Sequence, residues 1–181
     1  GRLATLTDPG SRITQYAYDS QGNLATVTYP GAAVRTYHYE NTTYPKALTG
    51  ITDENAQRTA TYTYDTQGRA TASEHGASNS GIDRHTVTYN ANGSATINDA
   101  LGTARTFTYL DQFSTAKLAG SNQPGGAGCG PSAQSVSYDA NGFVASRTDF
   151  NGNQTTYVHN SRGLETSRTE AFGSAQARTV T

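Results

Sequence analysis

Four histidines are the side chains best suited to general acid–base chemistry: His38, His75, His85 and His159. Serine hydrolases that use a Ser-His-Asp arrangement often place the nucleophile in a Gly-x-Ser-x-Gly turn, and the sequence contains none. The histidines share no spacing, and His159 occupies a position that is aromatic in the repeat described below, which favours a packing role. We therefore predict no catalytic residue and no enzymatic activity in this chain.

Two short segments resemble calcium-binding loops, at residues 139–142 and 149–153. An EF-hand loop requires glycine at its sixth position and a bidentate glutamate at its twelfth. Counted from Asp149, glycine is fourth and the twelfth residue is Asn160, so a turn is the better interpretation. Cys129 is the only cysteine, which excludes a disulfide framework and a thiolate zinc cluster. We predict no metal site and no cofactor.

Tyrosines recur along the whole chain and could stack on sugars or on an unfolded polypeptide. Ten of them form a periodic series: Tyr16, Tyr18, Tyr37, Tyr39, Tyr62, Tyr64, Tyr89, Tyr109, Tyr138 and Tyr157. The alternative is structural, since cross-strand aromatic pairs stabilise a sheet by roughly 0.2–1 kcal/mol each. Recurrence in every unit favours this structural interpretation.

The composition restricts the class of protein. The chain has 181 residues, of which 34% are hydrophobic and 15% charged, with a net charge of -1. The low net charge argues against disorder and against a nucleic-acid partner, and no apolar stretch is long enough to span a membrane. The length allows an ordinary domain with a hydrophobic core. The absence of methionine suggests a piece of a longer protein.

A repeat organises the chain. The pattern is an aromatic pair at positions i and i+2, then Asp or Asn, then glycine three residues later, and its second aromatic position recurs every 20 to 29 residues in about seven copies. The copies near residues 39 and 109 lack the glycine turn. The motif residues are Tyr16, Tyr18, Asp19, Gly22, Tyr37, Tyr39, Tyr62, Tyr64, Asp65, Gly68, Tyr89, Asn90, Gly93, Tyr109, Tyr138, Asp139, Gly142, Tyr157, Asn160 and Gly163.

Each copy predicts a β-hairpin. The aromatic pair shares one face of a strand, the Asp or Asn side chain caps a turn, and glycine supplies a positive φ. Return strands should begin two residues after the glycine, at Leu24, Ala70, Ala95 and Val144, and further turns should follow Thr7, Thr52, Asn98 and Thr148. Residues 120–132 are rich in glycine and proline and predict an inserted loop without strand character. No long helix is expected.

These Tyr-x-Tyr-Asp-x-x-Gly units and their Thr-Asp links resemble the YD repeats of the RHS family, which includes bacterial polymorphic toxins, wall-associated proteins, toxin-complex components and teneurins. The resemblance covers nearly the whole chain and implies an all-β array of antiparallel hairpins over residues 1–181, curved and spiralling as an arc of a shell. The family's self-cleaving aspartate site is not carried over, because Asp8-Pro9 lacks its sequence context.

The resemblance implies a structural role in a shell that encloses a C-terminal toxin or effector. The implied partners are adjacent RHS repeats and the enclosed polypeptide, and the implied location is secreted or cell-surface. Unpaired edge strands would also allow self-association. The alternative function is adhesion or carbohydrate binding through exposed tyrosines.

Overall fold

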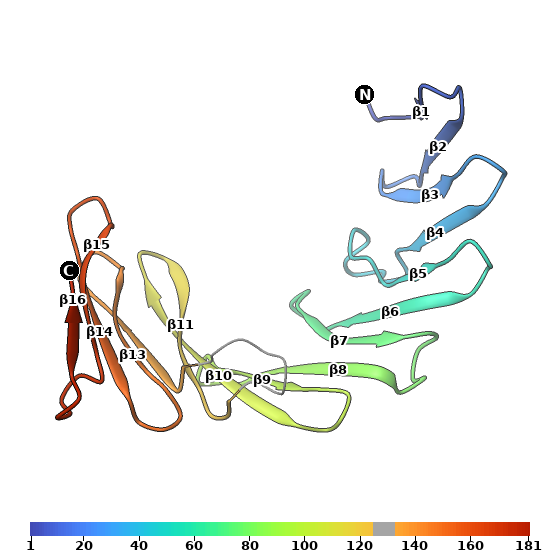
Figure 1. The fold of residues 1–181 in the computed structure, drawn as a ribbon. Helices are drawn as coiled ribbons and strands as arrows, with labels where there is room; N and C mark the ends of the chain where they lie inside the picture. Colours follow the sequence, from blue (N-terminus) through green and yellow to red (C-terminus); the bar gives the residue numbers. More distant parts are fainter. Residues whose placement is uncertain (125–132) are drawn as a thin grey trace. The chain divides into compact units, whose positions relative to one another are not determined.

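The computed structural model describes residues 1–124 and 133–181, and its regular structure in these ranges consists of β-strands (Figure 1). The sixteen strands found there are β1 (Thr5–Thr7), β2 (Ile13–Tyr18), β3 (Leu24–Thr28), β4 (Val34–His38), β5 (Gly50–Thr52), β6 (Arg58–Tyr64), β7 (Ala70–His75), β8 (Ile82–Tyr89), β9 (Ala95–Asn98), β10 (Ala104–Gln112), β11 (Thr115–Ser121), β12 (Ser135–Tyr138), β13 (Val144–Thr148), β14 (Gln154–His159), β15 (Glu165–Glu170) and β16 (Arg178–Val180).

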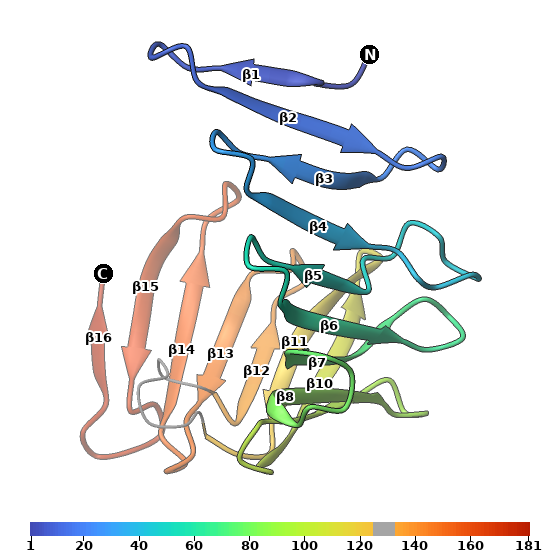
Figure 2. The ribbon, with the colours of Figure 1, turned by 90° about the vertical axis from the view of Figure 1, so that its right-hand side faces the viewer.

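The strands form an antiparallel meander in which hydrogen-bonded neighbours follow the order of the chain from β1 to β16. The sheet is not closed, because β1 and β16 end the order without pairing to each other. The chain divides into two compact units. The first comprises Gly1–Val87 with Asn98–Thr103, and the second comprises Thr88–Ile97 with Ala104–Thr181. Figure 1 shows the successive strands of the first unit, and Figure 2 shows β12 to β16 side by side in the second.

The hairpin prediction is confirmed strand by strand. The return strands β3, β7, β9 and β13 begin at Leu24, Ala70, Ala95 and Val144, two residues after the turn glycine. In the last copy the strand again begins at this position, which is occupied by Glu165. The predicted loop at 120–132 was placed too early, because Gly120 and Ser121 belong to β11. Residues 122–124 carry no strand, as predicted, and residues 125–132 of the predicted loop lie outside the described part of the chain.

A β-bulge follows the turn in four of the repeated hairpins. In the first, Ala17 pairs with Thr26 and Tyr18 pairs with Leu24, so that Ala25 has no partner of its own. The same one-residue shift occurs between β6 and β7, between β12 and β13, and between β14 and β15. A bulge strengthens the local twist of a sheet, so each of these hairpins is bent at the same point.

The strand registers separate two faces of the sheet within each unit. The tyrosine face carries Tyr16, Val27, Tyr37, Ile51 and Tyr62 in the first unit, and Tyr109, Leu118, Val136, Tyr138, Val144, Arg147, Thr155 and Tyr157 in the second. The opposite face is dominated by Thr and Ser, with hydroxyl contacts such as Ser137 to Ser146 at 2.7 Å.

The sheet has little hydrophobic core. Val27, Ala72 and Ala95 are the buried hydrophobic residues in the described ranges, and no large side chain there is fully buried. The expectation of an ordinary core was therefore wrong, because one layer of strands has no second layer against which to bury a face. None of the described residues forms a helix long and apolar enough to span a membrane.

Candidate functional site: the junction between repeats

The turn that closes each repeated hairpin has one hydrogen-bonding pattern, shown here for Asp65. Its N–H donates to the carbonyl of Arg69 at 2.9 Å, and the Gly68 N–H donates to the Asp65 carbonyl at 3.0 Å. One carboxylate oxygen accepts the N–H groups of Gln67 and Arg69, each at 2.9 Å. The same pair of backbone bonds closes the turns that begin at Asp19, Asn90, Asp139 and Asn160. The fourth residue is always a glycine, with φ between +77° and +84°.

The turns at the opposite ends of the hairpins have the same hydrogen-bonding pattern. The sequence indicated the positions of these turns but not this shared pattern. Asp8, Asp53, Asp99 and Asp149 each accept the N–H of the residue four positions later, at 2.8–3.0 Å. The backbone bond from Arg12 is the largest cause that lowers the pKa of Asp8, and the side-chain amide of Asn153, followed by its backbone N–H, lowers the pKa of Asp149. In the first two turns the positive φ falls on Ser11 and Ala56, each at 60°, instead of on a glycine.

The second tyrosine of the motif binds the backbone of an earlier segment of the chain in three repeats. Its hydroxyl donates to a backbone carbonyl 15 to 20 residues earlier: Tyr18 to Leu3 at 3.0 Å, Tyr64 to Leu48 at 2.6 Å, and Tyr138 to Leu118 at 2.8 Å. These bonds join segments that belong to consecutive repeats. The sequence pattern indicates aromatic rings that pair across strands and gives no sign of this role of the hydroxyl groups.

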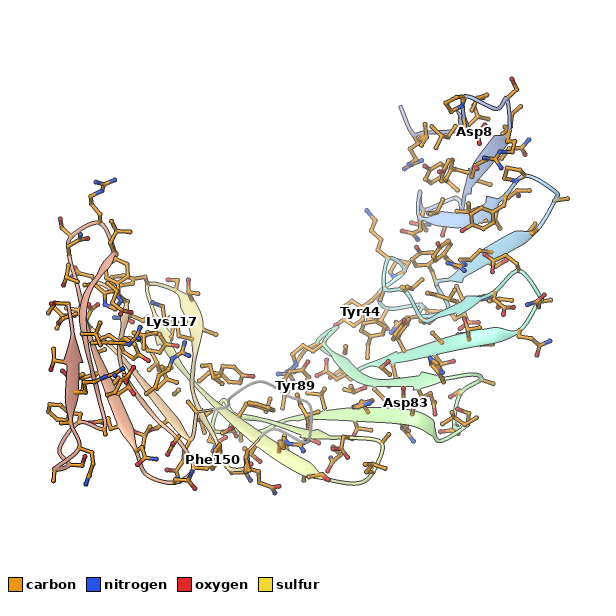
Figure 3. The ribbon with its side chains drawn as sticks, in the orientation of Figure 1. Asp8, Tyr44, Asp83, Tyr89, Lys117 and Phe150 are labelled. Carbon is orange, nitrogen blue, oxygen red and sulfur yellow. The ribbon has the colours of Figure 1, made fainter. Side chains whose placement is uncertain are left out.

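Four of the five turn glycines, all except Gly93, lie directly under side chains of the preceding repeat. A Cβ at Gly68 would lie 3.1 Å from the Tyr44 ring, and one at Gly163 would lie 2.7 Å from Cε1 of Phe143. Tyr44 also donates its hydroxyl to the Thr66 carbonyl at 2.5 Å, which fixes the ring over the turn. Figure 3 shows Tyr44 in the loop between β4 and β5. Glycine is therefore needed at these positions for close approach as well as for its positive φ.

In two other repeats the side chain that covers the turn glycine is a cationic one. The Arg2 guanidinium lies 5.3 Å from the centre of the Tyr18 ring and covers Gly22. The Lys117 ammonium group, labelled in Figure 3, lies 4.8 Å from the Tyr138 ring and donates to the Gly142 carbonyl. A cation over an aromatic face is attractive by about 0.5–1 kcal/mol at exposed sites. Different side chains thus serve the same contact between turn and preceding repeat.

In one of the two copies that lack the glycine turn, an ion pair takes its place. Glu40 occupies the Asp position of the copy that ends in Tyr39, and its carboxylate accepts two bonds from Arg58 at 3.0 Å and one from the Thr49 hydroxyl at 2.9 Å. The guanidinium of Arg58 also donates to the Thr49 carbonyl at 2.9 Å. The bonds from Arg58 are the largest cause that lowers the pKa of Glu40 from 4.5 to about 2.

Glu74 stabilises the loop from 76 to 81 in a similar way. Its side chain is buried, and its carboxylate accepts the N–H groups of Asn79 at 2.7 Å and Gly81 at 3.1 Å. The Asn79 bond is the largest cause that lowers the pKa of Glu74. A carboxylate that accepts backbone N–H groups acts here as a loop cap, which matches its position near the end of β7.

The other residues considered for chemistry are dispersed. The four histidines lie in β4, β7, β8 and β14, and the His159 ring packs between Phe143 and Tyr157, at 5.4 and 6.5 Å. No group of three or more His, Cys, Asp or Glu residues in the described ranges is placed to hold a metal ion. Cys129 lies outside the described residues.

Comparison with known proteins identifies the repeat. Residues 1–34 and 138–175 match the protein-family model described as RHS Repeat. A sequence search of the curated proteins finds no match.

The fold is similar to that of toxin-complex proteins of known structure. TcdB2-TccC3 without its hypervariable C-terminal region matches with a TM-score of 0.59 and 13% identity over 93% of this chain. TcdB2-TccC3-Cdc42 matches with a TM-score of 0.52 and 14% identity over 94%. The chain spans 9% and 11% of the length of those chains, respectively. Two segments of the chain therefore match the RHS repeat, and its fold is similar to that of these toxin-complex chains.

Proposed function

We propose that this chain is one stretch of a single repeat array that forms the wall of an RHS-type shell around a C-terminal toxin or effector polypeptide. The observation that supports this role most directly is the near-absence of a core. An open, single-layer sheet without a fully buried large side chain encloses nothing within its own described residues. A wall, in contrast, only requires that neighbouring hairpins stay joined side by side, and the contacts between repeats join them.

In this proposal the motif residues act by holding neighbouring repeats together, and no residue performs chemistry. The turn carboxylates, the turn glycines and the second tyrosine of each pair set the geometry of one hairpin against the one before it. The partners are the adjacent RHS repeats and the enclosed polypeptide, in a secreted or surface-exposed protein.

Limited proteolysis of the parent protein tests this role. A protease should leave a C-terminal polypeptide intact, and that polypeptide should co-elute with the repeats in size-exclusion chromatography. A parent protein with Gly163→Val, which breaks one junction, should lose this protection, whereas Arg162→Gln in the same turn should keep it. Free digestion of the C-terminal polypeptide in the unmodified parent would contradict the enclosing role.

A carbohydrate-binding or adhesive role is the second candidate, and one observation favours it. Tyr89 and Tyr109 are 37% and 44% exposed, in contrast to the half-buried rings of most other motif tyrosines. Figure 3 shows Tyr89 projecting from the end of β8. If this role is correct, binding to an immobilised polysaccharide should fall with Tyr109→Ala and not with Thr108→Ala on the opposite face.

A further inference from the structure

Three Asn-Gly pairs fill the third and fourth positions of three turns in the second unit. These pairs are Asn92-Gly93, Asn141-Gly142 and Asn151-Gly152. The three glycines have φ between +81° and +84°, and each donates its N–H to the carbonyl of the first turn residue at 3.0–3.1 Å. All three asparagines are exposed. Because the backbone is the same in each turn, differences in reactivity between the pairs come from the side chains around them.

An Asn-Gly pair reacts with itself in water without an enzyme. The glycine nitrogen loses its proton to hydroxide and attacks the side-chain carbonyl carbon, Cγ, of the asparagine. An N–C bond forms, the Cγ–Nδ2 bond breaks, and the amide nitrogen takes up a proton and leaves as ammonia. Water then opens the cyclic imide at either carbonyl, which gives aspartate or isoaspartate. Glycine permits the attack because it has no Cβ in the way, so the rate depends on how freely the two groups can meet.

Two of the pairs are restrained by neighbouring side chains. The side-chain oxygen of Asn92 accepts the Ser94 hydroxyl at 2.7 Å and the Ser94 N–H at 3.1 Å, which holds the amide against its own turn. Gly142 is half-buried beneath Lys117 and Phe113, and its carbonyl accepts a hydrogen bond from the Lys117 ammonium group. Each restraint opposes the rotation that would bring the glycine nitrogen onto the amide carbon.

Neither restraint is present at the third pair. The Asn151 side chain makes no hydrogen bond within the part of the chain that the structure describes. Gly152 is exposed, and a Cβ added to it would meet no atom within 4 Å. This turn is closed by Asp149, whose carboxylate accepts the N–H groups of Asn151 at 2.9 Å and of Asn153 at 2.8 Å. An exposed turn opens locally at low cost, and such an opening frees the Gly152 N–H for the reaction.

We propose that Asn151 is a site of spontaneous deamidation, and that among the three Asn-Gly pairs it reacts fastest in the folded chain. Either product places a new carboxylate in the turn that the Asp149 carboxylate already occupies. Isoaspartate also lengthens the main chain within the turn, which displaces the N–H groups of residues 151 and 153 from Asp149. The modification therefore loosens the hairpin of β13 and β14, whatever the chain encloses or binds.

The test is incubation of the folded 181-residue chain at mildly alkaline pH, followed by mass spectrometry of its tryptic peptides. Cleavage after lysine and arginine separates the three pairs into peptides 85–105, 118–147 and 148–162. Fragment ions locate the converted residue, and enzymatic methylation detects isoaspartate. We expect conversion at Asn151, and conversion at Asn92 at least about fivefold slower, because two hydrogen bonds hold its amide. In concentrated urea the three pairs should react at similar rates.

Ser94→Ala supplies a matched comparison, with circular dichroism to verify that the variant folds. Loss of the hydroxyl bond should raise the rate at Asn92 by about two- to tenfold and leave the rate at Asn151 unchanged. An unchanged rate at Asn92 would overturn this explanation of the selectivity.

Three results would overturn the inference itself. The first is equal rates at the three pairs in the folded chain, and the second is a faster reaction at Asn92 or Asn141 than at Asn151. The third is an unreacted Asn151 in the folded chain under conditions in which the urea sample reacts. The converted chain should also unfold at a lower temperature than the fresh chain, and equal unfolding temperatures would overturn the loosening of the hairpin.

Discussion

The contacts between repeats lead to a quantitative prediction for two glycine turns, one covered by a side chain of the preceding repeat and one uncovered. Gly93 and Gly163 have nearly the same φ, +81° and +78°, and both donate their N–H to the first residue of the turn. An added methyl group at Gly93 meets no atom within 4 Å, whereas at Gly163 it lies 2.7 Å from the Phe143 ring. The pair therefore separates the cost of the backbone conformation from the cost of crowding the preceding repeat.

Gly93→Ala should cost only the left-handed conformation, about 1–2 kcal/mol of unfolding free energy. Gly163→Ala should cost this amount and an added ~1–3 kcal/mol for displacing the ring. For a chain of this length about 1 kcal/mol lowers the Tm by roughly 2–4 °C. Gly93→Ala should therefore lower the Tm by about 2–8 °C, and Gly163→Ala by about 4–20 °C.

The assay is thermal unfolding followed by circular dichroism at the β-sheet minimum, with both variants repeated in a Phe143→Ala background. Removing the ring should abolish the additional loss at Gly163 and leave the loss at Gly93 unchanged. Equal losses from the two alanines in the unmodified background would refute the close-approach argument. No loss from either would refute the requirement for a positive φ.

Three further predictions concern single side chains. Ala56→Gly should stabilise the chain by about 0.5–1 kcal/mol, because alanine at φ 60° is strained, and a fall in Tm would argue against this turn geometry. Tyr138→Phe should lower the free energy of unfolding by about 0.5–1.5 kcal/mol, because it removes the hydrogen bond to the Leu118 carbonyl. Tyr109→Phe, with no such bond described, should lower it less. Equal effects on thermal unfolding would count against a stabilising role of the Tyr138 hydroxyl. Because folding lowers the pKa of Glu40 from 4.5 to about 2, its stabilising effect is complete above pH 4.5 and is lost as the pH falls toward 2. Glu40→Gln should flatten that part of the stability–pH curve measured by urea unfolding, and an unchanged slope would contradict the role of the ion pair.

The local structure of the hairpins was predictable because each turn carries its own chemical signal. An Asp or Asn that caps backbone N–H groups, followed by a glycine, fixes the turn within five residues, and the return strand then starts at a set position. The signal is weaker where the positive φ falls on Ser11 or Ala56, since nothing in their side chains requires that conformation. In the Asp8 turn, Gly10 is one residue too early to be the positive-φ residue.

The junctions were not predictable from these signals. Where a side chain covers the turn glycine, it differs from repeat to repeat: Arg2 covers Gly22, Tyr44 covers Gly68 and Phe143 covers Gly163, whereas Gly93 is uncovered. Their distances in sequence from the glycine also differ, because the intervening loops have different lengths. Only the second tyrosine of the motif is constant enough to have been noticed, and its hydroxyl partner is a backbone carbonyl, which leaves no trace in the sequence.

The described residues bury few hydrophobic side chains, and the amino-acid composition alone could not predict this. A hydrophobic content of 34% is compatible with a small globular core or with a single sheet whose two faces are each partly apolar. The strand register decides between them, because it distributes the tyrosines along one face and the threonines along the other without any covering layer.

Site-specific photo-crosslinking in the parent protein tests the enclosing role most directly. Tyr109 and Thr108 are adjacent, both exposed, and project from opposite faces of β10, so a crosslinking amino acid can be placed at each in turn. A wall around a guest predicts crosslinks to the C-terminal polypeptide from one of these positions and none from the other. Crosslinks from both positions alike, or from neither, would contradict the account of this chain as a shell wall.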